Sequence, residues 1–324
     1  MIPEEVIRIA DDIKSMRIRG AGRIARAAAD ALMIAAKSYR GDLDGFVRYM
    51  EKISKILLST RPTAVSLPNA ISYVMKATRR RYRSVEEAIE AVVRAAIEFK
   101  EYSERALELI GEIGSKMIED GMVIMTHCNS SAVTSILARA WGEGKRFRVY
   151  ATETRPRYQG YITARDLASK GIPTTLITDS AVAYIMRKAD LVLVGADAIA
   201  SNGALINKIG TSQVALAAKV YGVPFYVAAE TYKFSPYTLA GEAVEIEERD
   251  PREILDPPID GVEIRNPVFD ATPPEYIDAI ITEIGVISPE MAILVITDFL
   301  GHRISAEEPK GYEDSEIEYK KESD

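Results

Sequence analysis

Apolar residues recur at three- and four-residue spacing through the first third of the chain, which predicts amphipathic helices. The pattern covers residues 4–18, 23–39 and 43–58. Ser84 and Glu87 have the spacing of a capping box, which should open a further long helix that reaches about Ile118. We therefore predict an all-helical N-terminal domain over residues 1–118.

From residue 119 the pattern changes to short, almost continuous apolar runs that alternate with helical stretches. The runs are 122–128, 147–153, 174–178, 191–197, 224–230 and 292–299. Such runs are typical of parallel strands that are buried on both faces. They predict an α/β protein, in which a Rossmann-like doubly wound parallel sheet domain over residues 119–304 is preceded by the all-helical N-terminal domain. Residues 305–324 are highly charged, and we expect a frayed C-terminal tail there.

Most of these predicted strands end in polar residues. In open α/β sheets, ligands bind beyond the carboxyl ends of the strands. We therefore expect a functional site among the residues that end the runs, which are Thr126, His127, Cys128, Glu153, Thr178, Asp179, Asp197, Glu230, Thr231 and Asp298.

Composition and charge exclude several classes of protein. With 41 Lys and Arg against 48 Asp and Glu, the net charge is -7, which disfavours nonspecific nucleic-acid binding. One cysteine and two histidines, His127 and His302, exclude a disulfide framework and a multi-histidine metal site. The start of the chain does not resemble a signal peptide, and no apolar run approaches the ~20 residues that span a bilayer, so we expect a cytoplasmic protein with no membrane partner. Scarce Asn and Gln are typical of a thermophile.

A glycine turn, Arg19-Gly20-Ala21-Gly22, precedes the second predicted helix. Free amide groups at a helix amino end and a neighbouring arginine favour a phosphate ligand, although a plain turn between helices is the alternative. Gly20 to Ala25 also matches the dinucleotide pattern G-x-G-x-x-A. That interpretation is rejected because the pattern requires a preceding strand.

Two predicted strand ends carry the candidate reactive groups. Cys128 precedes Asn129, Ser130 and a predicted helix, where a thiol can become reactive, while a buried and inert cysteine is the alternative. His127 should point to the opposite side of the strand, so we give it a structural role. Asp197 is either a helix cap or an acid of the site.

Several cations and one amide are expected near the same edge of the sheet. They are Arg19, Arg61, Arg155, Lys208, Lys233 and Asn207. Local positive charge in an acidic protein suits a small, multiply phosphorylated ligand, although each cation alone could be a solvated surface charge. The arginine run 79–83 is interpreted as exposed.

Together these motifs resemble one superfamily over about residues 15–300. It contains 5-methylthioribose-1-phosphate isomerase, ribose-1,5-bisphosphate isomerase and the regulatory subunits of translation initiation factor 2B. The matching segments are Arg19-Gly20-Ala21-Gly22, Arg61-Pro62-Thr63-Ala64-Val65, Thr126-His127-Cys128-Asn129, Glu153-Thr154-Arg155-Pro156, Gly195-Ala196-Asp197 and Asn207-Lys208-Ile209-Gly210-Thr211. The resemblance implies a site between the two domains, a homo-oligomer such as a dimer or trimer of dimers, and Cys128 and Asp197 as the catalytic pair.

Within that superfamily, the Arg-Gly-Ala-Gly turn resembles the archaeal bisphosphate enzymes. The resemblance therefore implies isomerisation of ribose 1,5-bisphosphate to ribulose 1,5-bisphosphate in nucleoside-phosphate degradation, with methylthioribose 1-phosphate as the alternative substrate and a non-catalytic translation-factor subunit as the alternative function. Asp197 would act as the acid at the ring oxygen and Cys128 would move a proton from C2 to C1, without a metal or cofactor. The predicted substrate-binding residues are Arg19, Gly20, Ala21, Gly22, Arg61, Ser130, Arg155, Asn207, Lys208 and Lys233.

Overall fold

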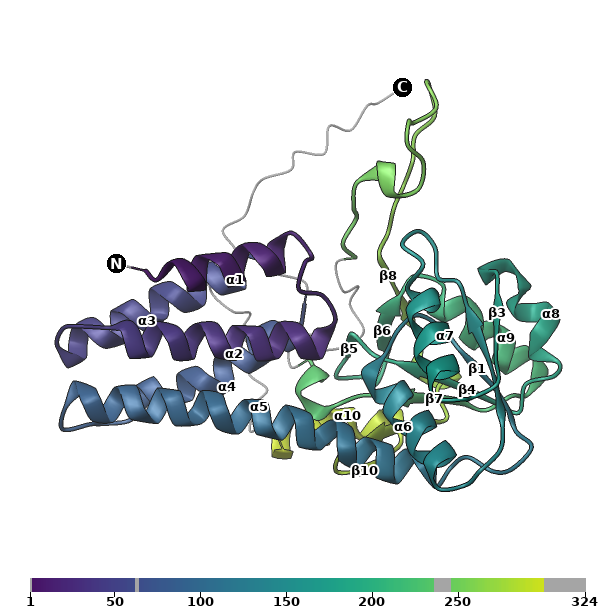
Figure 1. Ribbon diagram of the computed structural model, residues 1–324, viewed down its shortest axis with the longest axis horizontal. Coiled ribbons are helices and arrows are strands. Elements are labelled where there is room, and N and C mark those ends of the chain that lie inside the picture. Colours follow the sequence, from purple (N-terminus) through teal and green to yellow (C-terminus); the bar gives the residue numbers. More distant parts are fainter. Residues whose placement is uncertain (1, 62–63, 236–245, 300–324) are drawn as a thin grey trace, which may run out of the picture.

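The first third of the chain forms a bundle of helices in the computed structural model, and this bundle lies beside an α/β domain (Figure 1). The structure describes residues 2–61, 64–235 and 246–299. The bundle consists of α1 (Glu4–Lys14), α2 (Ala21–Ser38), α3 (Leu43–Leu58), α4 (Ser66–Met75) and α5 (Val85–Ser115). Leu32, Phe46 and Phe99 are fully buried in its core. The predicted helical character of the N-terminal region is thus confirmed. No helix among the described residues is long and apolar enough to cross a membrane.

The helix α5 joins the two parts of the molecule. At its amino end, Ser84 Oγ accepts a hydrogen bond from the Glu87 amide, as the capping box predicts. Phe99 lies in the core of the bundle, whereas Ile110 lies in a core of the α/β part. Because one helix contributes to both cores, the division at residues 118 and 119 stays a prediction.

The α/β part is built on a sheet whose described strands have the order β10-β9-β7-β4-β1-β2-β3. All neighbouring strands are parallel except β9 and β10. The strands are β1 (Val123–Thr126), β2 (Arg148–Thr152), β3 (Thr174–Ile177), β4 (Leu191–Gly195), β7 (Phe225–Ala228), β9 (Ala279–Thr282) and β10 (Gly285–Ile287). The chain reverses its direction of travel across the sheet between β1 and β4, which confirms the doubly wound prediction.

Both faces of this sheet are covered, as its continuous apolar strands require. Leu191 and Leu193 pack in one core with α6 (Ser131–Gly142), α7 (Gln159–Ser169) and the end of α5. Val192 and Val194 pack in another core with α8 (Val182–Met186) and α9 (Thr211–Tyr221). This alternation follows from the period of two along a strand.

A small antiparallel sheet, which the sequence patterns did not predict, lies beyond the carboxyl ends of the main strands. It contains β5 (Ala198–Ile199), β6 (Leu205–Lys208) and β8 (Phe269–Thr272). Lys208 pairs with Phe269 in register, and its Nζ lies 4.9 Å from the centre of that ring. This sheet therefore places Lys208 at the edge where the strand ends gather.

The predicted strand over residues 292–299 is wrong. These residues form α10 (Ala292–Leu294) and a π-helical turn (Val295–Phe299), and β9 supplies the missing parallel strand. Ala292, Val295 and Ile296 are buried, which is the spacing of one face of a helix. Asp298 is consequently not at a strand end. The predicted tail over residues 305–324 lies outside the described residues.

Candidate functional site

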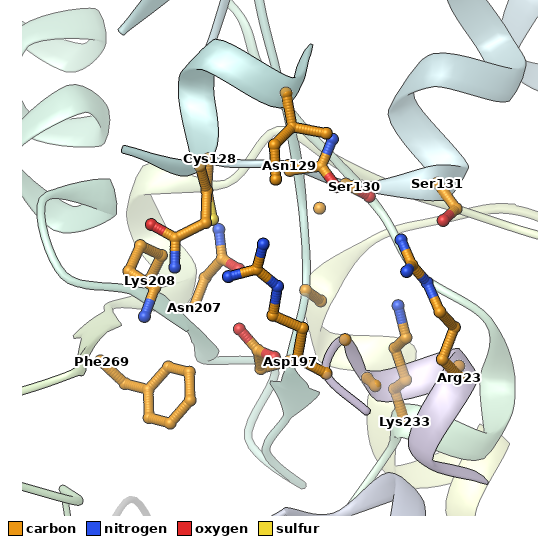
Figure 2. Close-up of a pocket in the computed structure, with 18 of the residues that line it drawn as sticks. Arg23, Cys128, Asn129, Ser130, Ser131, Asp197, Asn207, Lys208, Lys233 and Phe269 are labelled. Atoms are coloured by element: carbon orange, nitrogen blue, oxygen red, sulfur yellow. The ribbon is translucent and has the colours of Figure 1, made fainter. Parts of the chain in front are cut away.

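A cavity of about 260 Å³ lies where α2 begins and where β1, β4 and β7 end (Figure 2). Its walls come from both parts of the molecule, as the sequence analysis predicted for the site. The predicted residues that line it are Arg19, Gly20, Ala21, Gly22, Arg61, Cys128, Ser130, Asp197, Asn207, Lys208 and Lys233.

Cys128 and Asp197 lie on neighbouring strand ends. The strands β1 and β4 pair in parallel, with Ile124 opposite Leu191, and each candidate follows its strand by two residues. Both side chains line the cavity, and each is partly exposed (Figure 2). The two groups are thus on the same edge of the sheet and face the same space.

The backbone of Cys128 adopts an unusual conformation. Its φ is 68°, a left-handed value that costs a non-glycine residue about 1–3 kcal/mol. Two threonines hold it there: the Cys128 amide donates to Thr154 Oγ1 at 3.0 Å, and Thr163 Oγ1 donates to the Cys128 carbonyl at 2.8 Å. Strain that is held in this way is characteristic of residues whose orientation matters to function.

His127 supports the same strand end through hydrogen bonds of its two ring nitrogens. Its ring is buried, and burial lowers its pKa, so the ring is neutral at pH 7. Because the Ile209 carbonyl can only accept, the His127 Nε2–H donates to it at 2.9 Å, and Nδ1 accepts from Thr152 Oγ1 at 2.6 Å. Both ring nitrogens are therefore used in holding β1, β2 and the end of β6 together, which agrees with a structural role. His127 nevertheless lines the same cavity as Cys128, so the prediction that it points to the opposite side is wrong.

The surroundings of Cys128 do not activate its thiol. Burial raises its pKa to about 11, Asp197 acts in the same direction, and the Lys208 ammonium opposes them. The expectation of a lowered pKa at the helix amino end is thus not met, and the group is a thiol at pH 7. Burial also lowers the pKa of Lys208, against the effects of Cys128 and Asp197.

The cavity is strongly cationic. Among the described residues, seven cationic side chains line it against two carboxylates, Asp197 and Glu230. The cations are Arg19, Arg23, Arg26, Arg61, Lys208, Lys233 and Arg249. Since the whole chain carries a net charge of -7, this concentration of positive charge favours an anionic ligand.

The cations form two groups at different ends of the cavity. Figure 2 places Lys208 and Phe269 on one side, and Lys233 and Arg23 on the other. Arg61 and Arg249 belong with Lys208, because their charges lower its pKa. We call the first group the Lys208 end, which consists of Lys208, Arg61 and Arg249. We call the second group the Lys233 end, which includes the first turns of α2 and α6.

One carboxylate positions the arginines of the Lys208 end. Arg61 Nη2 lies 2.9 Å from Glu247 Oε2, and Arg249 Nε lies 2.8 Å from Glu247 Oε1. Burial alone would raise the pKa of Glu247, but hydrogen bonds from Arg249 and Arg61 lower it to about 2. Glu247 is therefore ionised and holds both guanidinium groups beside the cavity.

Helix amino ends contribute amide groups to the Lys233 end. Gly20 precedes α2 with φ of 89°, a backbone conformation that favours glycine. Ser130 caps α6 by accepting from the Val133 amide at 3.4 Å, and Ser131 opens that helix. Two helix amino ends at one cavity suit a phosphate group.

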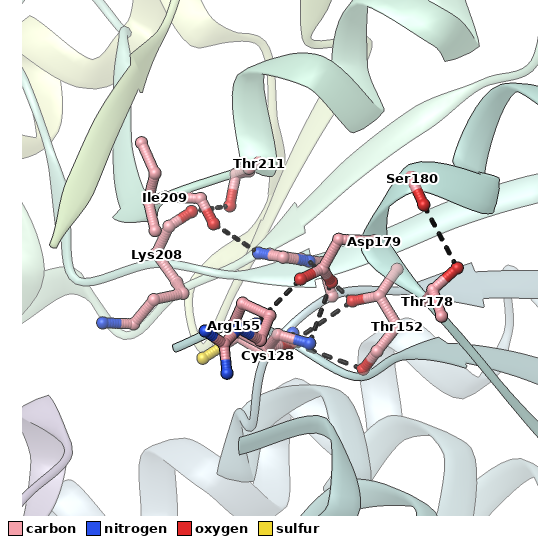
Figure 3. Close-up of polar contacts among 12 residues, drawn as sticks. Cys128, Thr152, Arg155, Thr178, Asp179, Ser180, Lys208, Ile209 and Thr211 are labelled. Carbon is pink, nitrogen blue, oxygen red and sulfur yellow. Dashed lines mark hydrogen bonds and ion pairs between the residues drawn. The ribbon is translucent and has the colours of Figure 1, made fainter. Parts of the chain in front are cut away.

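Arg155 does not belong to this site, contrary to the prediction. Its side chain is exposed and does not line the cavity. Its guanidinium instead donates to the Tyr158 hydroxyl at 2.5 Å and to the Ile254 carbonyl at 2.9 Å. The Arg155 amide donates to Asp179 Oδ2 at 2.8 Å (Figure 3).

The sequence analysis missed several lining residues. Arg23 and Arg26 follow the glycine turn at helical spacing, which could have suggested them. Arg249 lies in the highly charged stretch 247–253, where nothing distinguished it from surface charge. Gln159 also lines the cavity, and its Oε1 is buried with no hydrogen-bond partner among the described residues.

Comparisons with known proteins agree with this geometry. Residues 17–289 match the model of the Initiation factor 2 subunit family. The chain is 56% identical to ribose 1,5-bisphosphate isomerase from Archaeoglobus fulgidus over 92% of this chain and 95% of that protein. It is 38% identical to methylthioribose-1-phosphate isomerase from Thermosynechococcus vestitus over 87% and 85% of the two chains. The solved structure of the translation initiation factor eIF-2B from Pyrococcus horikoshii OT3 has a TM-score of 0.79 and 36% identity, and the match covers 90% of this chain and 99% of that chain.

Proposed function

The chain belongs to the initiation factor 2 subunit family, and from that premise we propose that it is an isomerase that converts ribose 1,5-bisphosphate to ribulose 1,5-bisphosphate. The observation that carries this proposal is the single cavity that joins Cys128 and Asp197 with cations at two ends. A sugar bisphosphate needs positive charge at each of its two phosphates. Its isomerisation also needs two acid–base groups beside the sugar carbons that react.

The two alternatives fit the cavity less well. A methylthio group needs apolar walls in place of the second phosphate site, but the Lys233 end carries Arg23, Arg26 and Lys233. A non-catalytic translation-factor subunit would have no use for Cys128 and Asp197 on one cavity. The greater identity to the bisphosphate enzyme, 56% against 38%, points the same way.

We assign one end of the cavity to each phosphate on electrostatic grounds. The charge of Lys208 acts on both Cys128 and Asp197, so the Lys208 end lies next to the reacting carbons. The C1 phosphate therefore binds at Lys208, Arg61 and Arg249. The C5 phosphate binds at the Lys233 end, where the first turns of α2 and α6 add their amide groups.

The catalytic pair starts with the proton on sulfur, because the pKa of Cys128 is about 11. Transfer of that proton to Asp197 produces a thiolate and a carboxylic acid together. The thiolate is then able to accept a proton from C2, and the acid is able to donate one to the ring oxygen. This single transfer prepares both groups, and Lys208 stabilises the thiolate that forms.

The bond changes follow from these two roles. Cys128 removes the C2 proton as the C1=C2 bond forms, the bond between C1 and the ring oxygen breaks, and Asp197 protonates that oxygen. The resulting enol phosphate takes the proton back at C1 from Cys128, while the C2 hydroxyl returns a proton to Asp197. The phosphate stays on C1 throughout, and the product is the ketose bisphosphate. The cations of the Lys208 end stabilise negative charge that develops during these steps.

The proposed enzyme is a cytoplasmic homo-oligomer. Association between copies is supported by exposed apolar side chains on α8 and α9, where Tyr184, Leu216 and Val220 are 75%, 50% and 71% exposed. Large exposed apolar side chains that gather on one surface favour association.

The test is a direct assay with two sugars. Purified protein is incubated in parallel with ribose 1,5-bisphosphate and with 5-methylthioribose 1-phosphate, and the ketose products are followed by NMR. We expect kcat/KM to be at least about 100-fold higher for the bisphosphate, because about two charge-assisted hydrogen bonds are lost with the second phosphate. Equal or reversed preference would contradict the proposed substrate, and no ketose from either sugar would contradict the proposed reaction.

A further inference from the structure

A continuous chain of polar contacts joins two cations of the Lys233 end through the protein interior. Arg26 Nη1 donates to Ser103 Oγ at 3.0 Å, and Ser103 Oγ lies 3.0 Å from the Tyr232 hydroxyl. That hydroxyl donates to Glu230 Oε1 at 2.9 Å, and Lys233 Nζ lies 2.6 Å from Glu230 Oε2. We call these five residues the Arg26–Lys233 chain. Both of its ends line the cavity.

The direction of each hydrogen bond in the chain is determined. Burial would raise the pKa of Glu230, but Lys233 and the hydroxyl of Tyr232 help to lower it, so the carboxylate is ionised and only accepts. The one hydroxyl proton of Tyr232 goes to Glu230, and its oxygen therefore accepts from Ser103. The Ser103 oxygen in turn accepts from Arg26, so both hydroxyl protons of the chain point toward Glu230.

Burial leaves the inner members no substitute partner. The exposed fraction is 0% for Ser103 and 2% for both Tyr232 and Glu230. A buried carboxylate that loses a donor therefore cannot turn to bulk water, and it draws the remaining cations more closely to itself.

The chain also crosses between the two parts of the molecule. Arg26 lies on α2 and Ser103 lies on α5, both of the helical bundle. Glu230, Tyr232 and Lys233 follow β7 of the main sheet. Tyr232 packs within the core of the bundle, 5.5 Å from Phe99 between ring centres. The chain thus connects Arg26 of the bundle with Lys233 of the α/β part, and a phosphate would bind between these two cations.

The glycine turn lies directly against this chain. A Cβ at Gly22 would be 3.0 Å from the Tyr232 hydroxyl and 3.5 Å from Glu230 Oε1. The first turn of α2 can therefore approach the chain closely only because residue 22 has no side chain. The glycine turn is therefore in close contact with the middle of the chain that connects the two cations.

We propose that the Arg26–Lys233 chain is a positioning network that fixes the spacing of Arg26 and Lys233 for recognition of the C5 phosphate, with Tyr232 as its central positioning residue. This inference rests on the proposed function, because it concerns the second phosphate of that substrate. When the Tyr232 hydroxyl is absent, Glu230 pairs more tightly with Lys233, and less of that charge is available to the phosphate.

The test compares Tyr232→Phe with Tyr102→Phe. Tyr102 is a matched control on α5: its ring lies 6.2 Å from that of Tyr232, and its hydroxyl donates to Glu283 and contacts Thr231, outside the cavity. We expect Tyr232→Phe to raise KM for ribose 1,5-bisphosphate about tenfold, or about 1.4 kcal/mol, with kcat changed less than about threefold. Tyr102→Phe should lower Tm without changing KM. Equal KM values for both variants would overturn the proposal.

A binding measurement separates failure of this inference from failure of the proposed function. Ribose 5-phosphate carries only the remote phosphate, and its Kd can be measured by calorimetry without any turnover. We expect Tyr232→Phe to raise that Kd about tenfold relative to the wild-type protein, whether or not the protein isomerises the bisphosphate. If the Kd of Tyr232→Phe is unchanged while the wild-type protein isomerises the bisphosphate, the positioning network is refuted and the proposed function is not.

A second variant covers the case in which Tyr232→Phe does not fold. Ser103→Ala removes the link to Arg26 and leaves the bond between Tyr232 and Glu230. It should raise the Kd of ribose 5-phosphate about threefold on its own. If Tyr232→Phe folds, the double variant should show less than the product of the two single effects. An unchanged Kd in Ser103→Ala, or effects that simply multiply, would contradict a single connected chain.

Discussion

The state of the Cys128 thiol can be measured without interference, because the chain has one cysteine. Its rate of reaction with iodoacetamide therefore reports on that thiolate alone. With a pKa of about 11, a fraction of about 10⁻⁴ is ionised at pH 7, compared with about 3% for a free cysteine of pKa ~8.5. We therefore expect alkylation of the folded protein to be about 300-fold slower than that of free cysteine at this pH.

Two substitutions should move this pKa in opposite directions. The Lys208 ammonium stabilises the thiolate, so Lys208→Met should raise the pKa of Cys128 further. Asp197 destabilises the thiolate, so Asp197→Asn should lower it. We expect shifts of about one pH unit, which corresponds to about 1.4 kcal/mol. Lys188→Met, at an exposed position outside the cavity, is the control for loss of a lysine charge.

The assay is the second-order rate constant of alkylation as a function of pH for the wild-type protein and the three variants. Reaction of the wild-type protein as fast as free cysteine at pH 7 would refute a protonated resting thiol. Shifts of the same sign in Lys208→Met and Asp197→Asn would refute the opposed effects of these two charges. Either result would require a different starting state for the proton transfers.

Two further predictions concern the Lys208 end. Glu247 has a pKa of about 2 when folded and ~4.3 when unfolded, so its stabilising contribution is present above about pH 4.3 and is lost as the pH falls toward 2. This acid-dependent stability amounts to about 3 kcal/mol in full, of which about 1.6 kcal/mol is lost between about pH 5 and pH 3. Glu247→Gln should lack it, which urea unfolding between about pH 5 and pH 3 can measure. Equal acid sensitivity in both proteins would contradict the paired state of Glu247. Arg249→Ala should raise KM for ribose 1,5-bisphosphate about tenfold, whereas Arg265→Ala, which removes an exposed pair with Glu248, should leave it unchanged. An unchanged KM in Arg249→Ala would exclude that arginine from binding.

The strand-end rule accounts for most of what the sequence predicted correctly. Parallel strands bring their carboxyl ends to one edge, so residues that end strands meet there even when they are distant in the chain. Cys128 and Asp197 follow this rule, because β1 and β4 are neighbours in the sheet. Lys208 comes to the same edge by a different route, through the small sheet of β5, β6 and β8.

The failures have local physical causes. Residues 292–299 form an apolar run that both a strand and a buried helical turn can produce, and only tertiary packing decides between them. Arg155 follows a strand directly, but its guanidinium finds partners in Tyr158 and Ile254 on the outer side of the loop. The spacing of residues along the chain gives no information about such side-chain choices.

The buried partners of the site could not be predicted from the sequence. Ser103 lies in the middle of α5, and the sequence around it does not show whether this serine is buried or exposed. Its role follows only from the packing of α5 beside Tyr232, which is 129 residues away in the chain. Long-range contacts of this kind require the fold itself.

The most direct test of the account is the steady-state turnover of ribose 1,5-bisphosphate by the wild-type protein and by Cys128→Ser. A serine hydroxyl is a far weaker acid than the thiol, so it does not transfer a proton to Asp197. Without that transfer, residue 128 has no anionic form that could accept the C2 proton. We predict that kcat falls by about 10²–10⁴-fold while KM changes little, because the phosphate-binding cations are untouched. Turnover by Cys128→Ser near that of the wild-type protein would contradict the assignment of the proton transfers to this residue.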